Sequence, residues 1–191
     1  MIPGLLLTGG ASTRMGRAKA ELAWDGERLA DRVARVVGAV CAPVLEVGPG
    51  HSALPAVLED PPGSGPLVAL VAGVHALATS GAAPPVLVVA VDMPFVSEPL
   101  LTLLRDHPGD RSVVPVASGR AQPLCARYSA DACRLAVALT EAGERSMRAL
   151  LDAADVELVP ESRWQEVAGA DALVDVDTPD DVARWQRPRG G

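Results

Sequence analysis

One uninterrupted run of apolar residues, Val86 to Val91, constrains the fold of this chain more than any other feature of its sequence. Most of its side chains are β-branched, Pro84 and Pro85 precede it, and Asp92 follows it. A strand that is covered on both faces lacks the alternation of apolar and polar residues seen in a half-exposed strand. The run therefore predicts a central strand of a parallel sheet that lies between two layers of helices.

Other short apolar runs alternate with stretches of helical periodicity along the chain. The expected strands are 2–7, 44–47, 56–58, 86–91, 113–117, 124–128, 156–159 and 173–176. The expected helices are 27–40, 67–78, 97–105, 129–143, one that begins at 146, and one from 178 to about 186. This order predicts an α/β fold of three layers, with a doubly wound, mainly parallel sheet. We expect one domain over residues 1–187 and a flexible tail at 188–191.

Several helix starts carry their own signals. Ser97, Ser129 and Ser146 each stand before a helical stretch and are expected to be N-caps. The segment Thr178-Pro179-Asp180-Asp181 combines an N-cap threonine, a proline at the first helical position and an aspartate at the third.

Composition excludes some functions. Lys and Arg number 17 and Asp and Glu number 24, so the net charge is −7 and a general nucleic-acid binder is not expected. A small anionic ligand stays compatible, because a pocket can differ in potential from the whole protein. The three cysteines, Cys41, Cys125 and Cys133, have no zinc-site spacing and are expected to be buried thiols in a reducing compartment. Without a signal peptide or a run long enough to span a bilayer, the sequence predicts a soluble, cytoplasmic protein that does not enter membranes.

Ligands of doubly wound sheets bind beyond the carboxyl ends of the strands, so the residues after each apolar run are the candidates for a site. The first such loop runs from Thr8-Gly9-Gly10 through Arg14 to Gly16 and is followed by Lys19. Glycines let backbone N–H groups point at an anion, and Arg14 and Lys19 add donors suited to phosphate. An ordinary flexible turn is the alternative interpretation.

Acidic residues follow two of the other runs. Asp92 comes directly after the central run, where a carboxylate can hold Mg²⁺ together with phosphate oxygens. An Asx-turn before Pro94 is the alternative for Asp92. Asp175 and Asp177 flank Val176 late in the chain, and one of them could complete a metal site. Asp60 is a weaker candidate.

Taken together, these segments resemble the nucleotidyltransferases of Rossmann-like fold, and within them the molybdenum cofactor guanylyltransferases. The resemblance covers nearly the whole chain and rests on six motifs in order. They are the first loop with Lys19, Glu59-Asp60 with Gly65-Pro66-Leu67, Val91 to Phe95, Gln122-Pro123-Leu124, Gly143 to Ser146, and Asp177 to Trp185.

The resemblance implies roles for individual residues. It implies that the backbone of Leu7, Thr8, Gly9 and Gly10 holds guanine and the start of the triphosphate. Lys19 and Arg14 are expected at the phosphates, and Asp60 near the base or ribose. Asp92 is expected to bind the nucleotide and Mg²⁺, with Asp177 as a second metal ligand. Location and resemblance together suggest that Arg120, Gln122 and Arg145 form the wall that holds molybdopterin.

The sequence departs from the family pattern at three places. Thr8 stands where alanine is usual, and Val47 and Gly48 stand where the family has an asparagine that touches the nucleotide. Asp175 and Asp177 replace a frequent pair of asparagines. We still expect Val47 to contact the nucleotide. The sequence leaves the choice between GTP and CTP as the substrate open.

The implied reaction transfers GMP from GTP to molybdopterin, with or without molybdenum, and releases pyrophosphate. Alternatives are a molybdopterin cytidylyltransferase, a nucleotidyltransferase for another small phosphate, and a non-catalytic nucleotide-binding regulatory module. An NAD-dependent oxidoreductase ranks low, because the first loop lacks GxGxxG. Transient contact with proteins that deliver molybdopterin is also left open.

Overall fold

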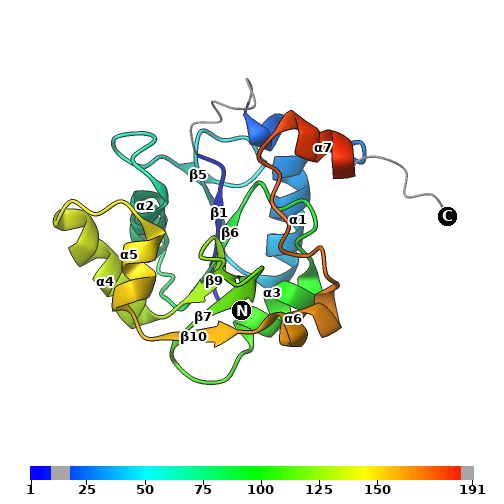
Figure 1. Ribbon diagram of the computed structural model, residues 1–191. Helices are drawn as coiled ribbons and strands as arrows, with labels where there is room; N and C mark the ends of the chain where they lie inside the picture. Colours follow the sequence, from blue (N-terminus) through cyan, green and yellow to red (C-terminus); the bar gives the residue numbers. More distant parts are fainter. Residues whose placement is uncertain (10–17, 186–191) are drawn as a thin grey trace.

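An eight-stranded sheet lies at the centre of the computed structural model, which describes residues 1–9 and 18–185 (Figure 1). The main path of the sheet has the order β10-β7-β9-β6-β1-β4-β5, and β8 pairs with β7 at one side. The strands are β1 Gly4–Leu7, β4 Val44–Val47, β5 Ala56–Val57, β6 Val86–Ala90, β7 Ser112–Ala117, β8 Arg120–Ala121, β9 Cys125–Tyr128 and β10 Val156–Val159.

Parallel pairing dominates the sheet. β1 is parallel to both β4 and β6, β4 is parallel to β5, and β10 is parallel to β7. Two strands are exceptions: β9 runs antiparallel between β6 and β7, and β8 pairs antiparallel with β7. Every residue of β6 is buried, so the predicted central strand and the mainly parallel α/β architecture are both confirmed.

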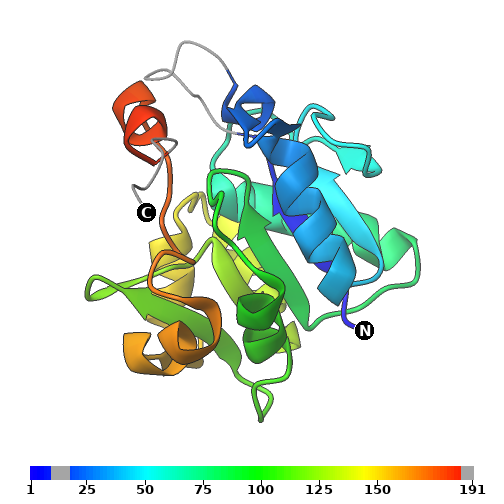
Figure 2. The ribbon, with the colours of Figure 1, turned by 90° about the vertical axis from the view of Figure 1, so that its right-hand side faces the viewer.

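Helices cover both faces of the sheet (Figures 1 and 2). Their bounds are η1 Lys19–Glu21, α1 Leu29–Val40, α2 Pro66–Thr79, α3 Glu98–Arg105, α4 Ala130–Glu141, α5 Met147–Ala153, α6 Glu161–Ala168 and α7 Pro179–Trp185. Buried residues of α1, α3 and α6 form one apolar cluster with one face, and those of α2, α4 and α5 form a second cluster with the other. The doubly wound, three-layer arrangement follows from these two clusters.

Of the three predicted serine N-caps, two are confirmed and one is wrong. The hydroxyl groups of Ser129 and Ser146 accept hydrogen bonds from Ala132 N and Arg148 N. Ser97 precedes α3, but its buried hydroxyl has no hydrogen-bond partner among residues 1–9 and 18–185. Pro99, the second residue of α3, has no N–H group, which removes one of the two N–H groups that a capping oxygen can use, and Leu100 N does not bond to the Ser97 hydroxyl either.

The predicted strand at 173–176 is wrong. Leu173 and Val176 are buried in the cluster on the α1 side of the sheet, but the segment pairs with no strand. A single backbone hydrogen bond, from Val176 N to Asp92 O at 2.9 Å, ties the segment to the end of β6. The apolar side chains therefore cover the sheet and do not extend it.

Several short features were not predicted, among them the helix η1 and the strand β8. Residues 27–28 belong to a hairpin, β2 Ala23–Trp24 with β3 Glu27–Arg28, and not to the following helix. Its turn residues Asp25 and Gly26 both have positive φ, which is typical of a two-residue Asp-Gly hairpin turn. The short helix α6 was also missed, and the predicted tail at 188–191 lies outside the described residues.

None of the helices in the described part of the chain is long and apolar enough to cross a membrane.

Gly73 of α2 lies where the helix packs tightly against the sheet. A methyl group at this position would lie 2.6 Å and 2.7 Å from the two δ-carbons of Leu5, and 2.9 Å from Val47. We expect Gly73→Ala to lower the free energy of unfolding by about 1–3 kcal/mol, because the packed layer has no room for the methyl group.

Gly38 of α1 is the matched control, because a methyl group there would meet nothing within 4 Å. Gly38→Ala should raise the free energy of unfolding by roughly 0.5–1 kcal/mol through helix propensity. Urea titration measures both variants, and equal effects of the two substitutions would contradict the packing argument.

Candidate active site

A cavity of about 340 Å³ opens at the carboxyl ends of β1 and β6. Leu7 of β1 lies opposite Ala90 of β6, so the residues that follow both strands leave the sheet at the same place. The lining residues are Leu7, Thr8, Gly9, Lys19, Glu59, Gly63, Gly65, Pro66, Ala69, Ala90, Val91, Asp92 and Leu124. The structure thus brings together the described part of the first loop, Lys19 and Asp92, as the sequence predicts.

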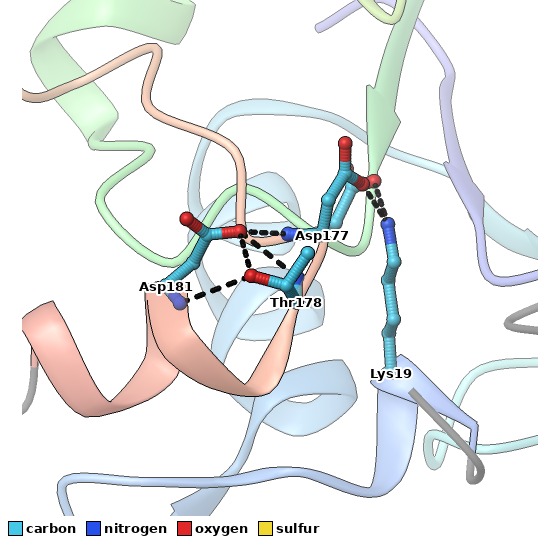
Figure 3. A network of polar contacts seen from close by, with 5 residues as sticks. Lys19, Asp177, Thr178 and Asp181 are labelled. Carbon is cyan, nitrogen blue, oxygen red and sulfur yellow. Dashed lines mark hydrogen bonds and ion pairs between the residues drawn. The ribbon is translucent and has the colours of Figure 1, made fainter. Parts of the chain in front are cut away.

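Lys19 lies between two carboxylates (Figure 3). Its Nζ is 2.9 Å from Asp92 Oδ2 and also donates a hydrogen bond to Asp177 Oδ1. Burial acts to lower the pKa of Lys19, but the negative charges of Asp92 and Asp177 outweigh burial and raise it. The ammonium group is therefore charged at neutral pH, and both carboxylates face one cation.

The segment before α7 places Asp177 at this cluster (Figure 3). The Asp181 carboxylate accepts hydrogen bonds from Asp177 N at 3.1 Å, Thr178 N at 2.9 Å and Thr178 Oγ1 at 2.8 Å. Asp181 N in turn donates to Thr178 Oγ1 at 3.2 Å, so the predicted helix start is confirmed as a reciprocal cap. These bonds, those of the Thr178 hydroxyl first, hold the pKa of Asp181 below its usual value.

Aromatic contacts fix α7 beside the hairpin. The ring of Phe95 lies 5.4 Å from the ring of Trp24 and 5.0 Å from that of Trp185, both in edge-on geometry. With the bond from Val176 N to Asp92 O, these contacts hold the late acidic segment against the end of β6. Two residues that are 85 positions apart in the sequence, Asp92 and Asp177, therefore meet at one lysine.

Asp175 occupies a different place from Asp177. It lines a separate groove with Arg120 and Gln122, and the Lys19 cluster does not include it. Burial first, and the negative charge of Asp177 second, raise the pKa of Asp175. The residue pattern alone left both residues open, and the structure places Asp177, the one that the resemblance implies, at the Lys19 cluster.

A buried carboxylate joins Thr8, at the end of β1, to the loop that follows β4. Glu46 of β4 is 0% exposed and accepts a hydrogen bond from Thr8 Oγ1 at 2.6 Å. It also accepts from Gly50 N, His51 N, Ser52 N and Ser52 Oγ, at 2.6–3.0 Å. Burial acts to raise the pKa of Glu46, but the hydrogen bonds, led by Ser52 and Thr8, outweigh it and lower the pKa. Glu46 was not among the predicted site residues, because a lone glutamate in a strand carries no motif.

The residues at positions 8, 47 and 48, which depart from the family pattern, are sterically compatible with one another. A side chain at Gly48 would place its Cβ 2.0 Å from Thr8 Oγ1, so the threonine and the glycine occur as a compatible pair. The Val47 side chain is buried in the core, while its carbonyl accepts hydrogen bonds from Thr8 N at 3.0 Å and Gly9 N at 3.3 Å. Val47 therefore supports the loop through its backbone and does not line the cavity.

Other predicted site residues are placed as follows. Gly10 and Arg14 lie outside the described residues. Asp60 is exposed and is not part of the cavity wall, whereas its neighbour Glu59 is 4% exposed and lines the cavity. The Arg145 guanidinium donates to the carbonyls of Thr140 and Glu144 at the end of α4.

The donor set fits a divalent cation of the magnesium type. Within residues 1–9 and 18–185, no group of three or more His, Cys, Asp or Glu side chains forms a closed metal site. Mg²⁺ characteristically binds through one or two carboxylates and completes its shell with phosphate oxygens and water. Asp92 and Asp177, which already face one cation, supply that number of carboxylates.

A mainly parallel sheet that is covered by helices on both faces and has a cavity at the carboxyl ends of its strands is the architecture of a Rossmann-like fold. Residues 4–159 match the family model described as "MobA-like NTP transferase domain". The chain belongs to this family and is a nucleotidyltransferase.

Two named relatives and one solved structure are similar to this chain over most of its length. The chain is 37% identical over 163 residues, 81% of each chain, to a protein of Mycobacterium bovis named "Probable molybdenum cofactor guanylyltransferase". A Mycobacterium marinum protein of the same name is 36% identical over 187 residues, covering 93% of this chain and 92% of the relative. Among solved structures, molybdopterin-guanine dinucleotide biosynthesis protein A from Archaeoglobus fulgidus superimposes with a TM-score of 0.80 at 21% identity, covering 96% of both chains.

The Glu46 network yields a stability prediction. We expect Glu46→Gln to lower the free energy of unfolding at pH 7 by about 2–4 kcal/mol, because an amide NH₂ then faces donors that need an acceptor. The pKa of Glu46 is lowered in the folded state, so its contribution is full above the unfolded value of about 4.3 and is lost as the pH falls through the folded pKa.

Urea titrations between pH 7 and pH 3.5 measure the effect. The difference between wild type and Glu46→Gln should shrink as the pH falls below about 4. Glu27→Gln is the control, because Glu27 also has a lowered pKa but forms its ion pair with Arg35 in solvent. A small and pH-independent effect of Glu46→Gln would show that the buried charge does not stabilise the loop.

Proposed function

We propose that this protein transfers GMP from GTP to molybdopterin, with or without bound molybdenum, and releases pyrophosphate. The observation that carries the proposal is the meeting of Lys19 with Asp92 and Asp177 at the cavity beyond β1 and β6. Its support comes from family membership and from relatives, 36–37% identical, that bear the guanylyltransferase name.

The cavity wall offers several groups to a nucleoside triphosphate. Gly9 contributes backbone without a side chain, and Lys19 contributes a fixed positive charge. The first turn of α2 also lines the cavity through Pro66, so the positive end of that helix faces the same space. These groups suit the phosphates, and we include Arg14 and the backbone of Gly10 in the same role.

The reaction needs no covalent intermediate. A phosphate oxygen of molybdopterin attacks the α-phosphorus of GTP, and the bond to the pyrophosphate oxygen breaks in line with it. Asp92 and Asp177 would hold Mg²⁺, which supplies neutralisation of charge at the α-phosphate. Lys19 stabilises the charge that builds up on the leaving pyrophosphate, and the rigid sheet edge aligns the two substrates.

We propose that the acceptor lies toward the groove of about 450 Å³ that Arg120, Gln122 and Asp175 line. The segment that follows Asp175 leads to Asp177 at the Lys19 cluster, and the loop after Gln122 leads to Leu124 in the cavity wall. Two segments of the chain therefore connect residues of the groove with residues at the nucleotide cavity. The Arg145 side chain is bound at the end of α4, so its contribution requires release from those carbonyls.

Three buried thiols support a reducing, cytoplasmic location as part of this proposal. Cys41, Cys125 and Cys133 are unpaired and buried, and burial raises the pKa of Cys41 to about 11 and that of Cys125 and Cys133 to about 12.

A pyrophosphate-release assay with each of the four ribonucleoside triphosphates tests the function. We expect release with GTP that requires both molybdopterin and Mg²⁺. Preference for CTP would make the protein a cytidylyltransferase instead. Binding of GTP without release under any condition would favour a nucleotide-binding regulatory module.

The role of Asp92 gives a second test in the same assay. Asp92→Ala should lower kcat/KM about 10²–10³-fold, because the reacting phosphates lose a placed charge partner. Asp131→Ala on α4 is the control, since Asp131 is 85% exposed and pairs only with Arg134 among the contacts of the described residues. Near-normal turnover by Asp92→Ala would refute the assignment.

A further inference from the structure

Lys19 lies between the same two carboxylates that a metal ion would need. Its Nζ donates to Asp92 Oδ2 at 2.9 Å and to Asp177 Oδ1, so two acidic side chains share one ammonium group (Figure 3). The side chains of Lys19 and Asp92 are largely buried, with exposed fractions of 17% and 22%. Positive charges a few ångströms apart repel each other strongly where little water screens them. Lys19 and a divalent cation therefore exclude each other from these oxygens.

The lysine side chain has a second direction in which it can point. Lys19 and Asp92 both line the cavity, whereas Asp177 is not among the lining residues. The backbone of Lys19 is held in η1, where its carbonyl accepts a hydrogen bond from Leu22 N at 3.1 Å. A lysine ammonium group stands on a flexible stem of four carbons. The group can therefore turn from the carboxylates into the cavity while η1 stays in place.

A triphosphate in the cavity would attract the ammonium group away from the carboxylates. Its oxygens carry more negative charge than two carboxylates do, and phosphate is a strong acceptor for lysine. Once the ammonium group has turned, Asp92 and Asp177 share one place without a counter-ion. Two carboxylates in this arrangement repel each other, and a divalent cation that binds both of them relieves the repulsion.

We propose that Lys19 competes with the divalent cation for Asp92 and Asp177 in the nucleotide-free protein, and that a bound triphosphate draws the lysine away and so raises the affinity of both carboxylates for the metal. The inference rests on the proposed function, since it requires a nucleoside triphosphate in the cavity. Metal and triphosphate then bind with positive coupling, and each raises the affinity for the other by the same factor. One lysine thus serves the metal ligands and the leaving pyrophosphate in turn.

Binding of Mn²⁺ to the nucleotide-free full chain tests the competition. The electron paramagnetic resonance signal of free Mn²⁺ measures the affinity without nucleotide, acceptor or turnover. Lys19→Met keeps an unbranched side chain but removes its charge, and we expect it to bind Mn²⁺ at least about 10-fold more tightly than the wild type. Equal or weaker binding by Lys19→Met overturns the proposal. If Lys19→Met does not fold, Lys19→Gln is measured in its place with the same expectation.

Three further variants show where the gain arises and why. Asp177→Asn in the Lys19→Met background should abolish it, and a gain that survives this change overturns the proposal. Lys19→Arg keeps the positive charge and should bind Mn²⁺ as weakly as the wild type. A gain in Lys19→Arg would mean that looser packing opens the site, which also overturns the proposal. Arg134→Met is the matched control, because it removes a positive charge from the exposed ion pair with Asp131 and should leave the affinity unchanged.

Metal-free GTP tests the transfer of the lysine to the triphosphate. In EDTA, displacement of a fluorescent GTP analogue measures the affinity for GTP alone. Asp177→Asn should tighten this binding at least about 5-fold, because it releases Lys19 from one of its two acidic partners. The same substitution in the Lys19→Met background should have a much smaller effect. Equal effects in the two backgrounds would reflect loss of repulsion alone and overturn the transfer.

The outcome is distinguishable from that of the proposed function, because neither binding measurement includes molybdopterin or turnover. If the wild type releases no pyrophosphate, the proposed function fails, and the affinities for Mn²⁺ and metal-free GTP still decide the role of Lys19. If release occurs as expected but Lys19→Met binds Mn²⁺ no more tightly than the wild type, the role of Lys19 alone is wrong.

Discussion

The parallel register of β1 between β4 and β6 is the constraint on which the site depends. Leu7 lies opposite Val47 on one side and opposite Ala90 on the other. Hydrogen bonds from Thr8 N to Val47 O at 3.0 Å and from Val91 N to Leu7 O at 3.0 Å continue the pairing past the end of β1. A shift of one residue would turn core side chains to the opposite face of the sheet, so burial on both faces fixes this register.

Charge at the carboxyl edge is arranged by contacts between distant segments. An acidic chain that handles polyanionic substrates needs fixed positive charge in the right place, and Lys19 supplies it within the described cavity wall. The same lysine holds Asp92 and Asp177 together, although burial of the ammonium group opposes the arrangement. The Thr178–Asp181 cap and the packing of Trp185 on Phe95 keep Asp177 in reach.

Local chemistry accounts for the features that could be predicted. The continuous apolar run of β6, the helical spacing in α1 and the caps at Ser129 and Ser146 all follow from neighbouring residues, and all are confirmed. The errors have local causes as well. Asp25-Gly26 is typical of a two-residue hairpin turn, and Pro99 removes one of the two N–H groups that the Ser97 hydroxyl could bind. Residues 173–176 were predicted to be a strand because burial against a sheet and pairing within a sheet favour the same apolar residues.

The sequence by itself determined the central strand, the alternation of strands and helices, and the loops that had to meet at one edge of the sheet, because periodicity, caps and glycines act over a few residues. Only the tertiary structure decided which acidic groups of those loops face the cavity. Asp177 and not Asp175 reaches Lys19, and Glu59 and not Asp60 lines the wall. Neighbouring carboxylates are chemically alike, and the direction of each side chain is set by contacts with segments far away in the chain.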